Sequence, residues 1–170
     1  MSATLDDLLA FIDIGGGQLQ FRQVCVEGLA RSVLQRLLAA ENGPVELRID
    51  PLPPCWADAG LLELVLRELL ANALKFSAGT APRRIAVGCE PAAPGRCVYT
   101  VQDNGVGLGG HHAGQLFKLF GRLHPSGTYE GRGAGLAKAS RAAQKLGGRL
   151  GARPAAGGGA TFVLDLRAAP

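Results

Sequence analysis

The sequence predicts a layered α/β domain, and two observations lead to this prediction: the pattern of elements along the chain, and its size and composition. Segments in which apolar and polar residues alternate, as in strands, are interleaved with segments in which apolar residues recur at helical spacing. Strands and helices mixed in this order are typical of a sheet covered by helices. The chain has 170 residues, 47% of them hydrophobic, which is the size and composition of one domain with a real core.

Charge and composition argue against several classes of protein. The longest apolar runs are well short of the ~18 residues that a membrane span needs, and no basic-then-apolar signal peptide opens the chain. The net charge of +4 is scattered, and aromatic residues make up only 5%. Proteins that bind nucleic acids usually gather basic residues on one face. We therefore expect a soluble, cytoplasmic domain with no nucleic-acid partner and no membrane contact.

The elements of the first half are predicted from apolar periodicity and from the glycines and prolines between them. In chain order they are a helix over 4–14, a strand near 20–24, a helix over about 26–40 and a strand over 45–50. Gly15-Gly16-Gly17 ends the first helix. Three prolines between residues 51 and 54 then interrupt the chain before the next helix.

The second half begins with a long helix whose expected N-cap is Asp58. The elements expected here are a helix over about 59–76, strands near 84–90 and 96–102, a helix over about 135–146, and a closing hairpin around 149–153 and 160–167. The intervening stretch 103–134 is rich in glycine and shows little periodicity. Gly147-Gly148 is the glycine stop expected at the end of a helix.

The helix over 59–76 carries a polar stripe along one edge of its apolar face. Glu68, Asn72 and Lys75 follow one another at spacings of four and three residues, so they line up on the helix surface. Carboxylate and amide oxygens suit a hard cation such as Mg²⁺, and an ammonium group suits a phosphate. The alternative is an ordinary solvated stripe with a Glu–Lys pair, which is common on surface helices.

Two glycine motifs follow this helix. Asp103-Asn104-Gly105-Val106-Gly107-Leu108 continues directly from a strand, and its aspartate can accept a hydrogen bond from a base edge while the glycines turn the backbone around a ligand. The same residues also suit a plain β-turn. Gly131-Arg132-Gly133-Ala134-Gly135-Leu136 precedes a helix, where backbone amides and the helix dipole favour an anion. Taken alone, this second cluster is equally consistent with a flexible loop.

Together, five segments resemble the motifs of sensor histidine kinases, in the family's order and spacing. ELLANALKFS (68–77) resembles the N-box, DNGVGL (103–108) the G1 box, LFKLFGRLH (116–124) the F-box, GRGAGL (131–136) the G2 box, and GGGATFVLDL (157–166) the terminal strand. The resemblance covers about residues 18–167. It therefore favours the nucleotide-binding interpretation of each motif over the simpler alternatives.

The resemblance implies a two-layer α/β sandwich, the Bergerat ATP-binding fold of the GHKL superfamily, with a mixed sheet packed on one layer of helices. By position it implies that Asp103 recognises the adenine amino group and that Thr161 helps to hold this end of ATP. Asn72 and Glu68 would act in catalysis and hold Mg²⁺, and Lys75 would contact a phosphate. The nucleotide-binding residues that it implies are Asn72, Lys75, Asp103, Gly105, Gly107, Leu108, Arg132, Gly133, Gly135, Leu136 and Thr161. Residues 109–130 would form a mobile ATP lid, packed through Phe117 and Phe120.

Glu68 departs from the residue that many kinases of this class carry, which is asparagine. In the family's hydrolysing relatives a glutamate at this position resembles a general base that activates water. In a kinase the same carboxylate would polarise an acceptor histidine or hold Mg²⁺. Arg132 and Ala134 are also less usual within the G2 box, although neither adds bulk that blocks binding.

The acceptor histidine of a histidine kinase is absent from this chain. Its histidines, His111, His112 and His124, all fall within the lid region. We therefore expect residues 1–17 to be the stub of a dimerisation helix and linker, and residues 18–170 to be the ATP-binding catalytic domain. The expected partners are a histidine-containing dimerisation or phosphotransfer domain and a downstream response regulator. Two alternatives stay open: an ATP hydrolase that uses Glu68 as its base, and a non-catalytic nucleotide-binding regulator.

Overall fold

Seven strands and five helices make up the part of the chain that the structure describes, which is residues 2–14, 16–110, 113–118 and 134–170 of a computed structural model. In chain order the elements are α1 (Ser2–Asp13), β1 (Phe21–Val24), α2 (Val26–Leu38), β2 (Val45–Ile49), β3 (Cys55–Asp58), α3 (Ala59–Ser77), β4 (Arg83–Glu90), β5 (Arg96–Asp103), α4 (Ala113–Leu116), α5 (Gly135–Lys145), β6 (Arg149–Pro154) and β7 (Ala160–Arg167). No helix among these residues is both long and apolar enough to cross a membrane.

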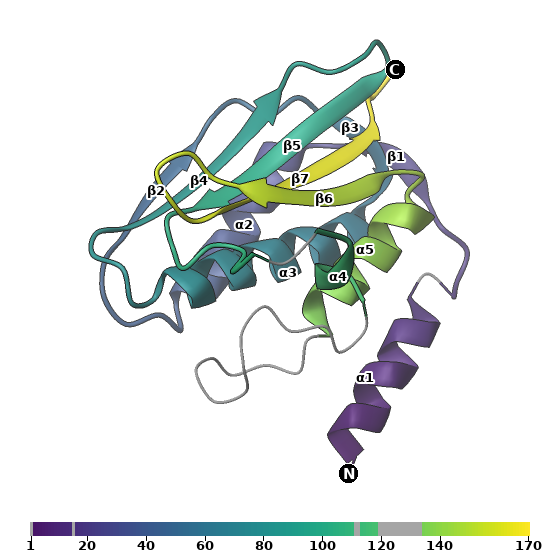
Figure 1. Cartoon of the computed structure of the whole chain (residues 1–170). Helices are drawn as coiled ribbons and strands as arrows, with labels where there is room; N and C mark the ends of the chain where they lie inside the picture. Colours follow the sequence, from purple (N-terminus) through teal and green to yellow (C-terminus); the bar gives the residue numbers. More distant parts are fainter. Residues whose placement is uncertain (1, 15, 111–112, 119–133) are drawn as a thin grey trace.

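Five of the strands form a mixed sheet in the order β2-β4-β5-β7-β6. β2 runs parallel to β4, and the other neighbours are antiparallel. Helices α2, α3 and α5 cover one face of this sheet, with α3 beneath its middle (Figure 1). The predicted two-layer α/β sandwich, with a mixed sheet on one layer of helices, is confirmed.

The core lies between the sheet and α3. Alternate residues of β4, β5 and β7 point toward the helices and are buried, because successive side chains of a strand face opposite sides. They meet one broad apolar face of α3. The largest of these buried side chains are Tyr99, Phe162, Leu62, Leu66, Leu69, Leu70, Ile85 and Leu164. Burial of a large apolar side chain stabilises the fold by about 1.5–3 kcal/mol, so this interface holds α3 firmly in place.

Helix α3 begins where the sequence predicts it. The Asp58 carboxylate accepts hydrogen bonds from the Leu61 amide at 3.1 Å and from the Gln20 amide at 2.9 Å. These bonds, with that of Gln20 the strongest, hold the pKa of Asp58 below its ordinary value. Asp58 therefore caps the helix and also ties it to the chain just before β1.

Two short elements were not expected from the sequence. β3 forms a separate two-stranded antiparallel sheet with β1, although the prolines before it predicted only an interruption. Only four residues separate Pro54 from α3, too few for a periodic signal, and the strand exists because β1 supplies its hydrogen-bonding partner. The short helix α4 lies in the glycine-rich stretch, whose sequence shows little periodicity.

Helix α1 approaches the rest of the structure at its C-terminal end, where the Arg141 guanidinium carbon lies 5.8 Å from the centre of the Phe11 ring. In Figure 1 its N-terminal end extends away from the sheet and the other helices. Leu5, Leu9 and Ile12 are exposed, whereas Ile14 is buried. The boundary between residues 1–17 and 18–170 stays a prediction.

Candidate functional site

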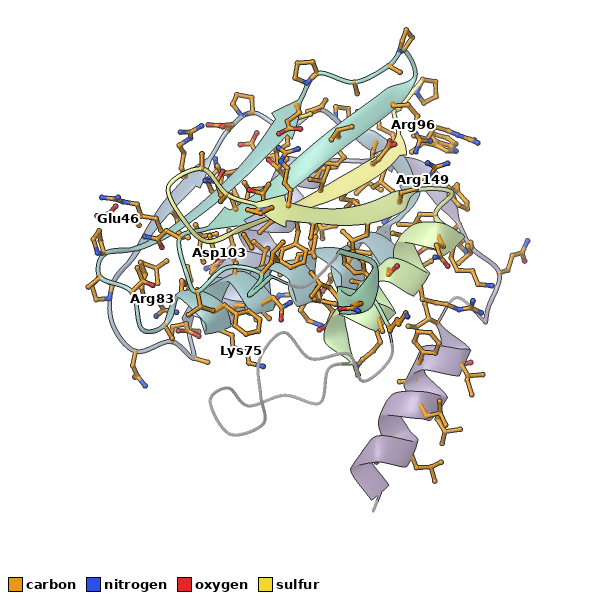
Figure 2. The ribbon with its side chains drawn as sticks, viewed as in Figure 1. Glu46, Lys75, Arg83, Arg96, Asp103 and Arg149 are labelled. Carbon is orange, nitrogen blue, oxygen red and sulfur yellow. The ribbon has the colours of Figure 1, made fainter. Side chains whose placement is uncertain are left out.

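The end of β5 and the end of α3 meet at one place. Asp103, the last residue of β5, is only 3% exposed, and its Oδ1 accepts a hydrogen bond from the Gly105 amide at 2.8 Å. The next amide, that of Val106, donates to the Phe76 carbonyl in the last turn of α3 at 3.2 Å. Figure 2 shows Asp103, Lys75 and Arg83 toward the same end of the molecule, with Arg96 and Arg149 at the other.

Glycine is required at two positions of this junction. A Cβ on Gly105 would collide with the carbonyl group of Phe76, so only a residue without a side chain lets the loop lie against α3. Gly159, in the turn between β6 and β7, has a φ of +91° and lies just as tightly against the Asp103 carbonyl. The loop after β5 is therefore enclosed between the end of α3 and the turn before β7.

Burial raises the pKa of the Asp103 carboxyl above its ordinary value, and hydrogen bonds from the Gly105 and Ala160 amides only partly oppose this shift. A carboxylate here has lost most of its water, and its two oxygens have room for a further hydrogen bond from a ligand N–H group in addition to the two backbone amides. Asp103 is thus a buried acceptor at the end of a strand, as the sequence predicted.

The polar stripe of α3 lies beside this junction. Glu68, Asn72 and Lys75 are half-buried, in contrast to the fully buried Leu69 and Leu70 between them. The Glu68 carboxylate also forms an ion pair with Arg67 at 3.3 Å. Lys75 immediately precedes Phe76, the residue whose carbonyl bonds the loop after β5, and the Lys75 Nζ lies 5.2 Å from the centre of the Phe76 ring.

The N-terminus of α5 meets the other end of the stripe. A Cβ on Gly135, the first residue of α5, would lie 2.5 Å from the Glu68 Oε2. The residue before it, Ala134, offers no side chain to cap the first-turn amides of α5. The Glu68 carboxylate therefore faces the positive end of a helix, where an anionic group is stabilised.

The remaining predicted site residues fall into two groups. Gly107, with a φ of +76°, lies against the Gly159 carbonyl, and Leu108 and Leu136 are buried in the core beneath the site. Phe117 packs edge-to-face on Phe162, with ring centres 6.4 Å apart, which agrees with the packing role expected for it. Arg132, Gly133, Phe120 and most of the expected lid lie outside the described residues.

The strand register does not bring Thr161 to the face on which Asp103 lies. Thr161 is the cross-strand partner of Gln102, and directly paired residues point to the same side of a sheet. Gln102 is exposed on the face away from the helices, whereas Asp103, one residue later, is buried on the other. Ala160, one residue before Thr161, is the β7 residue whose amide reaches the Asp103 carboxyl. The role of Thr161 at the adenine end stays a prediction without support from this register.

Sequence reasoning missed two polar anchors of the site. Asn104 bridges to the start of β4, because its Oδ1 accepts from the Arg84 amide and its Nδ2 donates to the Pro82 carbonyl, each at 2.8 Å. An Asn within Asp-Asn-Gly after a strand is a signal for such backbone bonding. The second anchor is Arg83, buried against the end of α3. A single arginine at the start of a strand gave no signal.

The chemistry of these groups fits a nucleotide with a hard cation. Among the described residues no cluster of three or more His, Cys, Asp or Glu side chains forms a protein-only metal site. Glu68 and Asn72 offer one carboxylate and one amide oxygen, and Mg²⁺ typically takes one or two such ligands together with phosphate oxygens and water. The fit is therefore to a cation that arrives with a phosphate chain.

Comparison with known proteins supports the same conclusion. Residues 57–170 match the family described as "Histidine kinase-, DNA gyrase B-, and HSP90-like ATPase". Cyanobacterial phytochrome A from Nostoc sp. is 32% identical over 98% of this chain, and the sensor protein KdpD from Rathayibacter rathayi is 32% identical over 98%. The chain spans 22% and 19% of these two proteins, about a fifth of their length.

Solved structures show the same fold. The full-length ShkA structure in complex with AMPPNP superimposes with a TM-score of 0.79 at 27% identity, over 98% of this chain and 36% of that one. The mycobacterial sensor histidine kinase MprB gives a TM-score of 0.72 at 23% identity, over 90% of this chain and 99% of that one. The resemblance carried by the five motifs is confirmed. The chain belongs to the family of histidine kinase-, DNA gyrase B- and HSP90-like ATPases, and its homologues within that family include sensor histidine kinases.

Proposed function

We propose that this chain is the catalytic domain of a sensor histidine kinase, which binds Mg²⁺ and ATP and donates the γ-phosphoryl group to a histidine outside residues 1–170. One observation carries the proposal: two segments with predicted nucleotide-binding motifs, the loop after β5 and the start of α5, both lie against α3. Gly105 brings the loop after β5 against Phe76, and Gly135 brings the start of α5 against Glu68. The polar stripe of α3 runs between these two contacts.

Each group has a role that its surroundings support. The buried Asp103 carboxylate accepts a hydrogen bond from the adenine amino group, and the glycine backbone lets the base lie close to the strand end. Asn72 and Glu68 hold Mg²⁺, and Lys75 neutralises a phosphate. The N-terminus of α5 adds helix amides for the phosphate chain. Phosphoryl transfer needs little covalent chemistry from the protein, so positioning and charge neutralisation by these groups account for catalysis.

The partners of the proposed kinase follow from the missing acceptor. A histidine-containing domain must supply the phosphoryl acceptor, and a response regulator would take the group from it, within the cytoplasm. The exposed Leu5, Leu9 and Ile12 of α1 support a further helix packing on this segment, as expected for the end of a dimerisation helix.

The decisive experiment is a calorimetric titration with an ATP analogue that is not hydrolysed, in the presence and absence of Mg²⁺. We expect saturable binding that Mg²⁺ strengthens and that Asp103→Asn weakens. Absence of binding at millimolar analogue would refute the proposal. A second assay supplies ATP and a separate histidine domain, and follows labelled phosphate onto that domain.

One observation keeps hydrolysis as a second candidate. The Glu68 carboxylate lies at the N-terminus of α5, beside the place proposed for the phosphate chain, where a general base for water would act. Steady phosphate release that Glu68→Gln abolishes, without transfer to the histidine domain, would favour the hydrolase. Binding with neither release nor transfer would indicate a nucleotide-binding regulator.

A further inference from the structure

The last turn of α3 ends with every one of its final carbonyls bonded. Helix ends leave the last four carbonyls without helical partners, and here residues 74–77 are the four concerned. Two bonds are local, from the Ala78 amide to the Lys75 carbonyl and from the Thr80 amide to the Ser77 carbonyl. The Phe76 carbonyl receives the Val106 amide from the loop after β5. The fourth carbonyl, that of Leu74, is bound by side chains.

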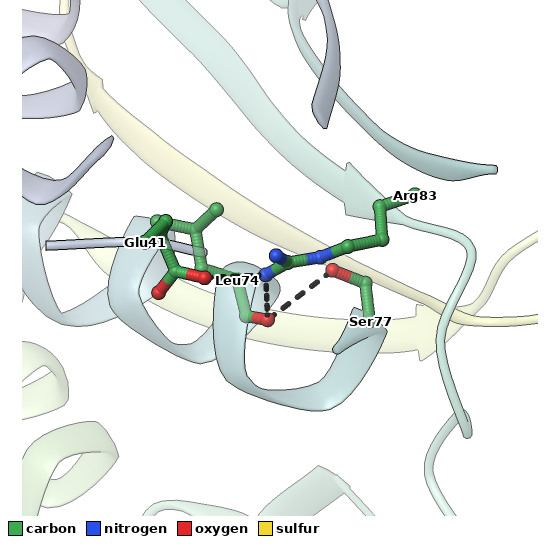
Figure 3. Close-up of polar contacts among 4 residues, drawn as sticks. All are labelled: Glu41, Leu74, Ser77 and Arg83. Atoms are coloured by element: carbon green, nitrogen blue, oxygen red, sulfur yellow. Dashed lines mark hydrogen bonds and ion pairs between the residues drawn. The ribbon is translucent and has the colours of Figure 1, made fainter. Parts of the chain in front are cut away.

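Arg83 provides the main bond to that carbonyl. Its Nη2 donates to the Leu74 oxygen at 2.7 Å and to the Glu41 Oε2 at 2.8 Å, and the Ser77 hydroxyl donates to the same Leu74 oxygen at 3.3 Å (Figure 3). Arg83 is only 8% exposed, and its Nε has no hydrogen-bond partner within the described part of the chain. A buried guanidinium with one unbonded N–H costs free energy of folding. The surrounding structure must therefore hold Arg83 in this position.

The neighbouring Arg84 shows what an ordinary arginine of this strand does. It points to the opposite face of the sheet, its side chain is 63% exposed, and it pairs with Glu46 across to β2 at 2.8 Å. Exposed pairs of this kind contribute little to stability. Arg83 and Arg84 are thus adjacent residues of the same type and charge, and only Arg83 contacts α3.

We propose that Arg83 is a positioning residue of the nucleotide site, which holds the last turn of α3 so that Lys75 and the Phe76 carbonyl keep their places. Leu74 immediately precedes Lys75 in the chain, and Phe76 is the next residue. The Arg83 side chain bonds this turn to β4, whereas the Val106 amide bonds it to the loop after β5. Loss of the Arg83 hydrogen bond frees the turn to move and weakens the hydrogen bond from Val106. The role of Arg83 in nucleotide binding rests on the proposed function, but the coupling between these two hydrogen bonds does not.

The test compares Arg83→Met with Arg84→Met in the whole chain, at a temperature where circular dichroism shows each variant folded. The first readout is hydrogen exchange of the Val106 amide without nucleotide. We expect Arg83→Met to speed this exchange by about tenfold, the effect of losing one charge-assisted hydrogen bond, and Arg84→Met to leave it unchanged. The second readout is affinity for the ATP analogue with Mg²⁺, which Arg83→Met should weaken by a similar factor.

Arg83→Lys separates positioning from general stability. A lysine ammonium still donates to the Leu74 carbonyl but lacks the planar fork that reaches Glu41 as well, so it should restore part of the Val106 protection and part of the affinity. It also serves as the test variant if Arg83→Met does not fold.

Unchanged Val106 exchange in a folded Arg83 variant, with only the melting temperature lowered, would overturn the inference and leave Arg83 a stabilising residue alone. If the wild-type chain bound no analogue, the proposed function would fail, and the exchange measurement would still decide whether Arg83 holds the turn.

Discussion

The Phe76 carbonyl accepts a hydrogen bond from the Val106 amide at 3.2 Å, and this bond joins the last turn of α3 to the loop after β5. The two segments are far apart in sequence, and each carries one of the predicted motifs. Gly105, immediately before Val106, permits the contact because its Cα lies against the same carbonyl. The helix that carries Lys75 and the strand end that carries Asp103 therefore form one unit, and a change at this contact should affect both.

Gly105→Ala tests that unit. The added methyl group would overlap the Phe76 carbonyl, which is backbone and cannot rotate away, so the loop and α3 must separate. We expect the free energy of unfolding to fall by about 1–3 kcal/mol, the usual cost of overpacking, and binding of the ATP analogue to be lost. Urea unfolding and calorimetry measure the two effects.

Gly79→Ala is the matched control for this substitution. Gly79 lies just beyond the same helix, is exposed, and has open space where a Cβ would be. It should leave both stability and binding close to those of the wild type. Equal stability and equal binding of the two alanine variants would show that the contact at Gly105 does not require glycine.

Asp103→Asn should separate binding from stability. Burial raises the pKa of Asp103 in the folded protein, so the fold favours the protonated carboxyl. The stability from this group is fully present below the ordinary aspartate pKa of about 3.9 and is lost as pH rises through the raised value. At neutral pH the wild type therefore carries a buried charge that asparagine removes.

We expect Asp103→Asn to unfold at a urea concentration equal to or above that of the wild type at neutral pH, and to lack this component of the pH dependence. Its affinity for adenine nucleotides should fall by at least about tenfold, since an amide cannot offer the same acceptor strength as a carboxylate. Unfolding curves across a pH series, with nucleotide titration at pH 7, provide the measurement. Unchanged affinity would remove Asp103 from the site.

The sequence predicted the long elements and the motif residues, because both leave periodic or compositional signals. The N-cap Asp58, the burial of Asp103 and the glycine end of α5 all follow from local chemistry. The strand β3 and the anchor Arg83 were missed for a common reason, since each depends on a partner distant in the chain: β1 for the strand, and the end of α3 for the arginine.

The contact between Glu68 and the start of α5 also depends on tertiary packing. A third prediction, for Gly135→Ala, follows from this contact. In Gly135→Ala the new methyl group meets the far end of the flexible Glu68 side chain, which can rotate away. Alanine also favours helix over glycine by about 1 kcal/mol in a helix interior, an upper limit at this first position. We therefore expect unchanged or slightly raised stability, together with altered phosphoryl chemistry because Glu68 is displaced.

A double-mutant cycle with Glu68→Ala checks the cause. The effects of Gly135→Ala and Glu68→Ala on phosphate transfer or release should be strongly non-additive, because the first acts by moving the group that the second removes. Additive effects would mean that the two residues act separately, and would remove Glu68 from the place proposed for it.

Thr161→Val is the substitution for which sequence and register disagree. The motif resemblance implies that Thr161 helps to hold the adenine end of ATP, so loss of its hydroxyl should weaken binding. Its pairing with Gln102 instead directs the side chain to the face away from Asp103. Valine has nearly the same shape as threonine and a higher preference for strands, so the fold should tolerate it.

From the register we expect affinity for the ATP analogue to stay within about twofold of the wild type. A hydroxyl on the far face makes no hydrogen bond to the nucleotide, so its removal costs none. A loss of tenfold or more would support the role implied by the resemblance, and would mean that the start of β7 twists enough for Thr161 to reach the nucleotide.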